Sequence, residues 1–429
     1  MNKMMFILVV LLTLPWNNLT AYPLYGSEDR GIGRLEQARL AHEGVIPGRK
    51  KISGELLSLE QVDLRMLDRK DFKLPKPDPE FTRKIVKLLG GNASRYGVAV
   101  LDLSDPEHPL YAEHNGEMPQ NPGSVGKIVV GTAIFQALAD IYPRSVKKRE
   151  AMLRETMITA DEFIHWDEHK VRMWNPQTRR LTRRPIKLGD QATLWVWLDW
   201  MLSASSNAAA ATCMEHAMLM VHYGKDYPVS SAEAKRFFAE TPKSKLRDLA
   251  VRTFQEPLTR NGINLEQLRQ GSIFTSTGKK KVPGTRSYAT AKELMNFLLR
   301  LEQGLIIDEF SSREIKRMLY MTERRIRYAS SPALRDAAVY FKSGSLYSCA
   351  PEEGFKCKKY HGNKYNYMNS IAIVESPAEN PRHYYLVTLL SNVLRRNSAV
   401  DHQTFATRVH RIIEKLHPVE PPPAETSRQ

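Results

Sequence analysis

The apolar positions of this chain form helix-like and strand-like groups, and their order predicts the fold. Apolar residues recur with helical spacing over 78–89, between an Asp-Pro start and a Gly-Gly stop. The segment 96–103 (YGVAVLDL) then reads as a strand, and 110–114 is its predicted hairpin partner. Strand character returns late in the chain, at 337–345, 367–375 and 383–394.

The middle of the chain has a different pattern. A long apolar helix is predicted over 125–142 (VGKIVVGTAIFQALADIY), and helical patterns with irregular loops continue to about residue 317. Further helices are predicted at 194–202, 208–221, 289–301, 312–321 and 404–416. This order predicts an α+β fold in which one antiparallel sheet with flanking helices is built from both chain ends (78–118 and 318–416), with an all-helical lobe (119–317) inserted.

The sequence patterns at the two ends of the chain predict segments that lie outside this fold. Lys3 precedes an apolar run (MFILVVLLTL) that is too short to span a bilayer, and Ala21 offers a cleavage point. We interpret 1–21 as a signal peptide, the alternative being a buried first element of the fold. The mature chain is then periplasmic or secreted, with no transmembrane anchor. The segment 22–77 is an extension of uncertain structure, and the Pro-rich 417–429 is a disordered tail.

Composition narrows the class of protein and of partner. The chain has 429 residues, of which 42% are hydrophobic and 26% charged, which is typical of a soluble globular protein with a large core. Its net charge of +16 has two interpretations. One is attraction to anionic envelope polymers, and the other, which we favour, is a solvated basic surface. Nucleic acid is not an expected partner of an exported chain.

The cysteines and histidines predict one disulfide and no metal site. Cys349 and Cys357 flank a short loop, and in an oxidising compartment we expect them to pair, the alternative being two free thiols. Cys213, in an Ala/Met-rich run, is interpreted as a small core residue. No Cys/His cluster has metal-ligand spacing, so no metal and no cofactor are expected. The pair His165/His169 is interpreted as loop or surface residues.

Ser124 and Lys127 have a spacing that suits nucleophilic catalysis. A serine hydroxyl needs a nearby base to accept its proton, and residues i and i+3 share a helix face. A buried lysine amine has a lowered pKa and can act as that base. The pair opens a strongly apolar helix after a Pro-Gly turn, where free N–H groups favour negative charge. The same spacing occurs in basic, polar surroundings, where lysine stays protonated, at Ser145/Lys148 and Ser276/Lys279.

Two further short motifs follow Ser124/Lys127 along the chain. Ser205-Ser206-Asn207 is the only Ser-x-Asn of the chain, between two apolar segments. Lys342-Ser343-Gly344, followed by Ser345, is the only Lys-[Ser/Thr]-Gly and lies in a predicted strand. A hydroxyl and an amide near the nucleophile can relay a proton and orient a substrate amide, while a lysine and a hydroxyl can bind a carboxylate. The ordinary alternatives are a helix cap and an edge-strand lysine.

Together the three elements resemble the penicillin-recognising serine enzymes, the serine β-lactamases and the D-Ala-D-Ala peptidases, and most closely the class A β-lactamases. The resemblance extends from about residue 78 to 416 and leaves 22–77 outside it. It implies the β-lactamase/transpeptidase-like fold and a small β-lactam or a peptidoglycan peptide as substrate. Ser124 is then the acylated nucleophile, Lys127 its base or proton relay, and Ser205 the group that passes a proton to the leaving nitrogen.

The resemblance also implies the substrate-binding groups. Asn207 holds the substrate's side-chain amide, and Lys342 and Ser343 bind its carboxylate. Gly344 permits close backbone approach. The backbone N–H groups of Ser124 and Ser345 form the oxyanion hole.

The chain departs from the class A pattern in three places. Class A enzymes carry a Glu, with an Asn four residues later, that activates the deacylating water. Glu240 is the candidate by position, but residue 244 is Ser, and the alternative is that Glu240 is a surface residue. Ser205 follows Ser124 by 81 residues, more than in the family, and the extra residues are placed in 164–190. A second insert is predicted at 347–366, and both inserts reshape or shield the cleft.

The leading hypothesis is therefore an acyl-serine hydrolase of β-lactam amide bonds. A D-Ala-D-Ala peptidase, or penicillin-binding protein, is the alternative within the class, since peptidases and β-lactamases differ in how fast water clears the acyl-enzyme. An esterase with the same Ser-Lys pair is a third possibility. A non-catalytic cell-wall-binding or sensor protein is a hypothesis of another class, disfavoured by the complete Ser/Lys/Ser/Asn/Lys set.

Overall fold

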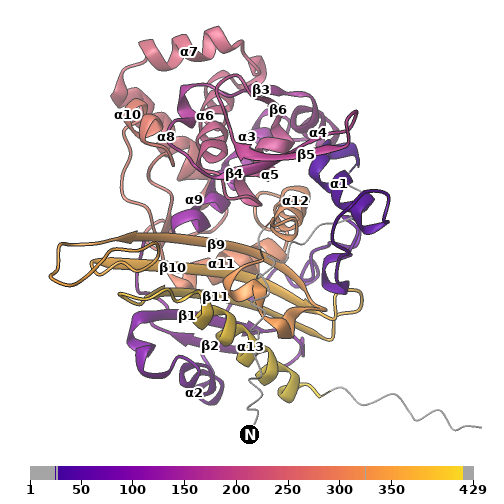
Figure 1. Ribbon diagram of the computed structural model, residues 1–429, viewed down its shortest axis with the longest axis vertical. Helices are drawn as coiled ribbons and strands as arrows, with labels where there is room; N and C mark the ends of the chain where they lie inside the picture. Colours follow the sequence, from indigo (N-terminus) through magenta and orange to yellow (C-terminus); the bar gives the residue numbers. More distant parts are fainter. Residues whose placement is uncertain (1–24, 26–27, 324, 419–429) are drawn as a thin grey trace, which may run out of the picture.

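The computed structural model describes residues 25, 28–323 and 325–418 (Figure 1). The predicted signal peptide at 1–21 lies outside the described residues, as does the predicted tail beyond residue 418. Both remain predictions.

A five-stranded antiparallel sheet forms the base of the molecule (Figure 1). Its strand order is β2-β1-β11-β10-β9, so the first two strands of the chain pair with the last three. The strands are β1 (Tyr96–Asp102), β2 (Leu110–His114), β9 (Ala338–Ser348), β10 (Tyr365–Ser376) and β11 (His383–Asn392). The five predicted strands and the α+β class are confirmed.

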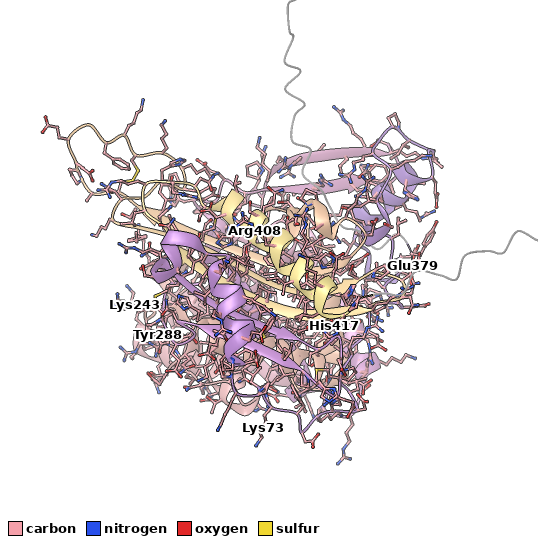
Figure 2. All side chains as sticks on the ribbon, turned by 90° about the horizontal axis from the view of Figure 1, so that it is seen from below. Lys73, Lys243, Tyr288, Glu379, Arg408 and His417 are labelled. Atoms are coloured by element: carbon pink, nitrogen blue, oxygen red, sulfur yellow. A yellow bond between two sulfur atoms is a disulfide. The ribbon has the colours of Figure 1, made fainter. Side chains whose placement is uncertain are left out.

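The sheet separates two apolar cores because alternate residues of a strand face opposite sides. On β1, Val98 and Val100 join the outer core, and Ala99 and Leu101 join the inner one. Figure 2 views the molecule from the outer side, where α2 and α13 cover the sheet. The flanking helices are α2 (Pro79–Lys87) and α13 (Ala399–Leu416) outside, and α11 (Ala291–Glu302) and α12 (Glu309–Tyr320) inside.

The lobe beyond the inner face is built around α3 (Lys127–Ile141), whose residues are almost all buried. The segment Gly123–Ile141 is long and apolar enough to cross a membrane by composition. Its most apolar window is 89% buried inside the fold, which is the environment of a core helix. The other lobe helices are α4 (Val146–Glu155), α5 (Leu194–Leu202), α6 (Asn207–Tyr223), α7 (Ser231–Glu240), α8 (Lys243–Phe254), α9 (Glu256–Arg260) and α10 (Ser276–Lys281).

The lobe is not all-helical, which corrects the prediction for 119–317. It contains three two-stranded sheets. These pair β3 (Met157–Thr159) with β6 (Gln191–Thr193), β4 (Lys170–Asn175) with β5 (Arg180–Pro185), and β7 (Leu268–Arg269) with β8 (Tyr288–Ala289). The largest, the hairpin β4–β5, lies within the predicted insert 164–190. Its strands are short, their residues are exposed or half-buried, and only Val171 of β4 is fully buried, so no clear apolar alternation marks them.

The described residues before residue 78 (25 and 28–77) are part of the folded body. They include α1 (Gly33–His42), which packs against β4, and a stretch whose apolar residues enter the inner core. Leu57, Leu59 and Val62 are at most 2% exposed. Arg34 of α1 forms a buried ion pair with Asp199 of α5 and also donates to the Met321 carbonyl, 2.8 Å away.

Replacing Arg34 by Met should lower the free energy of unfolding by about 3–5 kcal/mol, because Asp199 would remain as a buried carboxylate without its countercharge. Arg39→Met on the same helix is the matched control, since its pair with Glu43 is exposed and should change stability by less than about 1 kcal/mol. Urea unfolding followed by circular dichroism measures both. Equal effects of the two substitutions would contradict the structural role of the Arg34–Asp199 pair.

Candidate active site

Ser124 lies in a one-turn 3-10 helix, η4 (Gly123–Gly126), that leads into α3. Strand β9 passes directly against this turn. Gly123 has φ +53°, and a Cβ there would lie 2.8 Å from the Ser345 backbone nitrogen. A Cβ at Gly344 would lie 2.9 Å from the Ser124 nitrogen. Only glycine permits this approach, which brings the backbone N–H groups of Ser124 and Ser345 to one place.

Lys127 lies beneath Ser124 and is fully buried. Its Nζ is 3.1 Å from Ser124 Oγ and donates to the Ser205 carbonyl at 2.6 Å and to Asn207 Oδ1 at 2.8 Å. Burial disfavours the charged ammonium and lowers the pKa of Lys127 to about 7, although the charge of Asp167 acts in the opposite direction. Close to half of the Lys127 side chains are therefore neutral at pH 7 and can accept a proton.

Ser205 places a hydroxyl between two amines. It lies between α5 and α6 with φ +63°, a conformation that costs a non-glycine residue energy and recurs at functional sites. The neighbouring Ser206 caps α6 by accepting from Ala209 N. Ser205 Oγ is 2.9 Å from Lys342 Nζ on β9 and 3.5 Å from Lys127 Nζ. The three predicted motifs thus meet at one point.

These residues open into a small cavity of about 60 Å³. Six predicted site residues line it, namely Ser124, Ser205, Lys342, Ser343, Gly344 and Ser345. Asn207 lies behind them, bonded to Lys127. The other lining residues are His169, Ser203, Thr322, Ile326, Arg327 and Tyr360.

Glu240 does not lie near this cluster. The prediction that it is a catalytic residue is therefore wrong. Glu240 is exposed at the last residue of α7, which Figure 1 shows at the end of the lobe farthest from the sheet. The chain continues through Pro242 into α8 instead of folding back beneath Ser124. The groups next to the catalytic turn come from a later segment, with Phe274 beside Lys127 and Gln270 against Gly126.

The sequence interpretation did not include Asp167 and His169 among the site residues; His169 lies in a loop, as predicted, but that loop reaches the cavity. Asp167 accepts 2.8 Å hydrogen bonds from Ser206 Oγ and Ala208 N at the start of α6, and it pairs with His169 Nδ1. Burial acts to raise the pKa of Asp167, but the bond and charge of His169 and the donors on α6 outweigh it and hold that pKa well below its usual range. The bond to Ser206 spans 39 residues, so no local sequence signal marks it.

Both predicted inserts reach the cavity. His169 comes from the first, and Tyr360 comes from the loop between β9 and β10, which projects beyond the sheet in Figure 1. Cys349 and Cys357 form a disulfide in this loop, as expected, and Cys213 is a buried free thiol. The Tyr360 ring lies 5.5 Å from the guanidinium carbon of Arg327, which donates to the Gly344 carbonyl at 2.6 Å.

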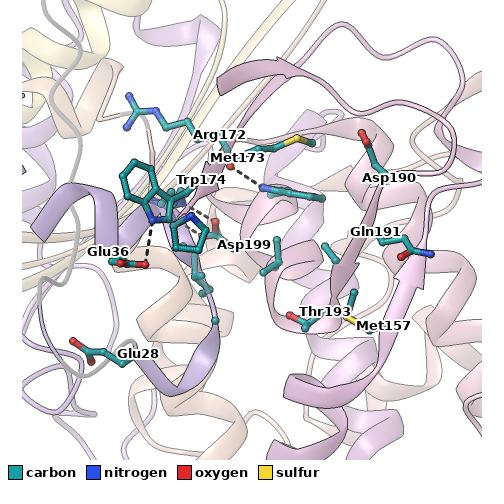
Figure 3. Close-up of a pocket in the computed structure, with 18 of the residues that line it drawn as sticks. Glu28, Glu36, Met157, Arg172, Met173, Trp174, Asp190, Gln191, Thr193 and Asp199 are labelled. Carbon is teal, nitrogen blue, oxygen red and sulfur yellow. Dashed lines mark hydrogen bonds and ion pairs between the residues drawn. The ribbon is translucent and has the colours of Figure 1, made fainter. Parts of the chain in front are cut away.

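A larger cavity of about 740 Å³ lies away from Ser124, between α1 and the hairpin β4–β5 (Figure 3). Its polar groups are largely paired with one another. Arg184 binds Asp190 at 2.6 Å, and the Trp174 indole donates to Glu36 at 3.1 Å. None of its lining residues belongs to the Ser124 cluster. The smaller cavity, which contains the Ser124 cluster, is therefore the candidate active site.

Comparison with known proteins identifies the family to which this chain belongs. A model described as the beta-lactamase enzyme family matches residues 80–410. No curated protein matches the chain. Similar solved structures include PBP-A, 15% identical over 80% of this chain and 100% of that one, with a TM-score of 0.49. A β-lactamase from Sphaerobacter thermophilus DSM 20745 is 12% identical over 79% and 98%, with a TM-score of 0.49.

Lys127 should titrate near pH 7, since its pKa is lowered to about 7 by burial. NMR of protein carrying ¹³Cε-labelled lysine measures this directly, with the resonance assigned by its loss in Lys127→Arg. Lys292 is the internal reference, because its hydrogen bond to Glu117 raises its pKa above the ordinary value. A Lys127 resonance that titrates together with that of Lys292 would contradict the prediction.

Proposed function

Since this chain belongs to the beta-lactamase enzyme family, a family of penicillin-recognising serine hydrolases, we propose that it is an exported enzyme of the class A type. In this proposal Ser124 forms an acyl-enzyme and the substrate is a β-lactam amide bond. One observation carries the proposal. The Lys127 amine is 3.1 Å from Ser124 Oγ, fully buried, and has its pKa lowered to about 7.

The acylation step follows from the positions of these groups. Neutral Lys127 accepts the proton of Ser124 Oγ while Oγ bonds to the lactam carbonyl carbon. The N–H groups of Ser124 and Ser345 bind the oxygen that becomes negative. Collapse of the tetrahedral intermediate breaks the C–N bond. Ser205, hydrogen-bonded to Lys342, gives the leaving nitrogen its proton and is reprotonated from the lysine pair.

The remaining groups suit a substrate with a carboxylate and an amide. Lys342 and Ser343 are neighbours on β9 at the cavity wall and offer a cation and a hydroxyl to a carboxylate. Asn207 offers its side-chain amide beside Lys127. Export is supported by the disulfide between Cys349 and Cys357, a bond that persists in oxidising compartments.

A D-Ala-D-Ala peptidase is the second candidate, and the composition of the cavity favours it. Among the residues that the structure describes, those that line the Ser124 cavity include no Asp or Glu. An acyl-enzyme without a base that activates water persists, and a β-lactam then acts as an inhibitor. The natural substrate would in that case be a peptidoglycan peptide, and the basic surface would hold the enzyme on anionic envelope polymers.

Incubation with benzylpenicillin should add the mass of one penicillin to the chain, and the adduct should map to Ser124. Intact-mass analysis and peptide mapping measure this. Ser124→Ala should form no adduct, because it removes the hydroxyl that lies 3.1 Å from the buried Lys127 amine. Ser145→Ala is the matched control: Ser145 has the same spacing to a lysine but caps an exposed helix start, so its loss should leave the adduct unchanged.

The fate of that adduct separates the two candidates. Steady turnover of a chromogenic cephalosporin supports the β-lactamase, and a burst followed by a stalled adduct supports the peptidase. Absence of both adduct and turnover in the unmodified chain would refute an acyl-serine enzyme of either kind. Turnover of simple esters without a β-lactam adduct would point to an esterase.

The acylation rate should depend on pH through Lys127. Below its pKa of about 7 the amine is charged and cannot accept the Ser124 proton. The second-order rate constant for penicillin should therefore be half-maximal near pH 7, fall about tenfold per pH unit below it and level off above it. Stopped-flow acylation between pH 5 and 9 measures the profile. A rate that stays constant from pH 5 to 8 would exclude Lys127 as the base.

A further inference from the structure

We propose that His169, oriented by Asp167, is the general base that activates water for hydrolysis of the acyl-enzyme. The inference rests on the proposed function, since it requires an acyl group on Ser124. It assigns a role in the second half of the reaction to a residue pair that the resemblance to class A enzymes does not supply.

Asp167 is fixed to the same element that carries the catalytic amide. Its carboxylate accepts hydrogen bonds from Ser206 Oγ and Ala208 N, both at 2.8 Å, at the first turn of α6. Its side chain is only 2% exposed, and its lowered pKa keeps it ionised across the neutral range. The pair is therefore anchored one residue from Ser205 and Asn207, although it comes from a loop far away in sequence.

The pairing fixes the tautomer of His169. An ionised carboxylate can only accept hydrogen bonds, so the Nδ1 atom that meets Asp167 carries a proton. In the neutral ring the lone pair is then on Nε2, which has no hydrogen-bond partner within the described part of the chain. Asp167 also stabilises the imidazolium that forms when Nε2 takes up a proton.

His169 lies where a deacylating water needs a base. It lines the same cavity as Ser124, and its side chain is 35% exposed, so water reaches it. The other titratable side chains that line this cavity are Lys342, Arg327 and Tyr360, which act as hydrogen-bond donors at neutral pH. Lys127 is not among the residues that line the cavity, and its amine faces Ser124 Oγ from below at 3.1 Å. His169 is thus the lining residue with an available basic lone pair.

The step balances without another reactant. Nε2 of His169 accepts one proton from a water molecule, and the water oxygen bonds to the acyl carbon on Ser124. The negative oxygen that results is held by the N–H groups of Ser124 and Ser345. Collapse breaks the bond between the acyl carbon and Ser124 Oγ, and the proton on His169 returns to Oγ. The products are the free acid and the starting enzyme.

The test separates acylation from deacylation in His169→Gln. The full-length protein is acylated with benzylpenicillin, excess reagent is removed, and adduct loss is followed by intact-mass analysis. Acylation should stay within about threefold of the unmodified protein, because Ser124, Lys127 and Ser205 are untouched. Adduct lifetime should increase at least about 100-fold, the lower range for loss of a general base. His165→Gln, in the same loop but not lining the cavity, should behave as the unmodified protein.

Rescue distinguishes a chemical from a structural role. Free imidazole should restore deacylation in His169→Ala but not alter the His165 control. A change that slows acylation and deacylation together, without imidazole rescue, would show that His169 only orders the loop and would overturn the inference. Equal adduct lifetimes with and without His169, or an adduct that never clears in the unmodified protein, would also overturn it. Failure of the unmodified protein to form any adduct would instead refute the proposed function.

Discussion

The burial of the Lys127 ammonium is the constraint on which the rest of this structure depends. The Ser205 carbonyl and Asn207 Oδ1 lie within 2.8 Å of its Nζ, and the charge of Asp167 favours the charged form. Burial disfavours it more strongly, and the balance brings the pKa to about 7. A fully solvated lysine in this place would keep its proton and Ser124 would be an ordinary hydroxyl. The reactivity of the site is thus a consequence of how completely the surrounding elements exclude water.

That exclusion requires three parts of the chain to meet without gaps. The core helix α3 places Lys127 inside, the junction of α5 and α6 covers it, and β9 closes the remaining side. The contacts that join them leave no room for a Cβ at Gly344, and they hold Ser205 with φ +63°. Because β9 belongs to a sheet that pairs both chain ends, the first strand and the last ones must be in register before the site exists. The position of the site thus depends on strand pairing between the two ends of the chain.

The sequence predicts those parts of the molecule whose signal is local. Strands such as β1 and β11 are buried on both faces and appear as continuous apolar runs. Ser124/Lys127, Ser205/Asn207 and Lys342–Ser345 each carry their chemistry within four residues. The hairpin β4–β5 lacks such a signal because polar, exposed strands do not alternate. Glu240 was misplaced because residue counting cannot show that the chain between α6 and α8 stays helical and leaves the site.

His169 and Asp167 could not be identified as site residues from the sequence, because their surroundings come from a distant part of the chain. Their partners are on α6, so a short Asp-x-His sequence acquires meaning only after α6 is placed. His169 also shares the cavity with Tyr360, and the volume of this cavity is about 60 Å³, well below the roughly 300 Å³ at which ligand pockets begin. Liquid water occupies about 30 Å³ per molecule, so this space suits water beside Ser124 better than a bicyclic substrate. Two of the residues that narrow the space beside Ser124, His169 and Tyr360, thus come from the inserts, whereas Ser124, Ser205 and Lys342 come from the three sequence motifs.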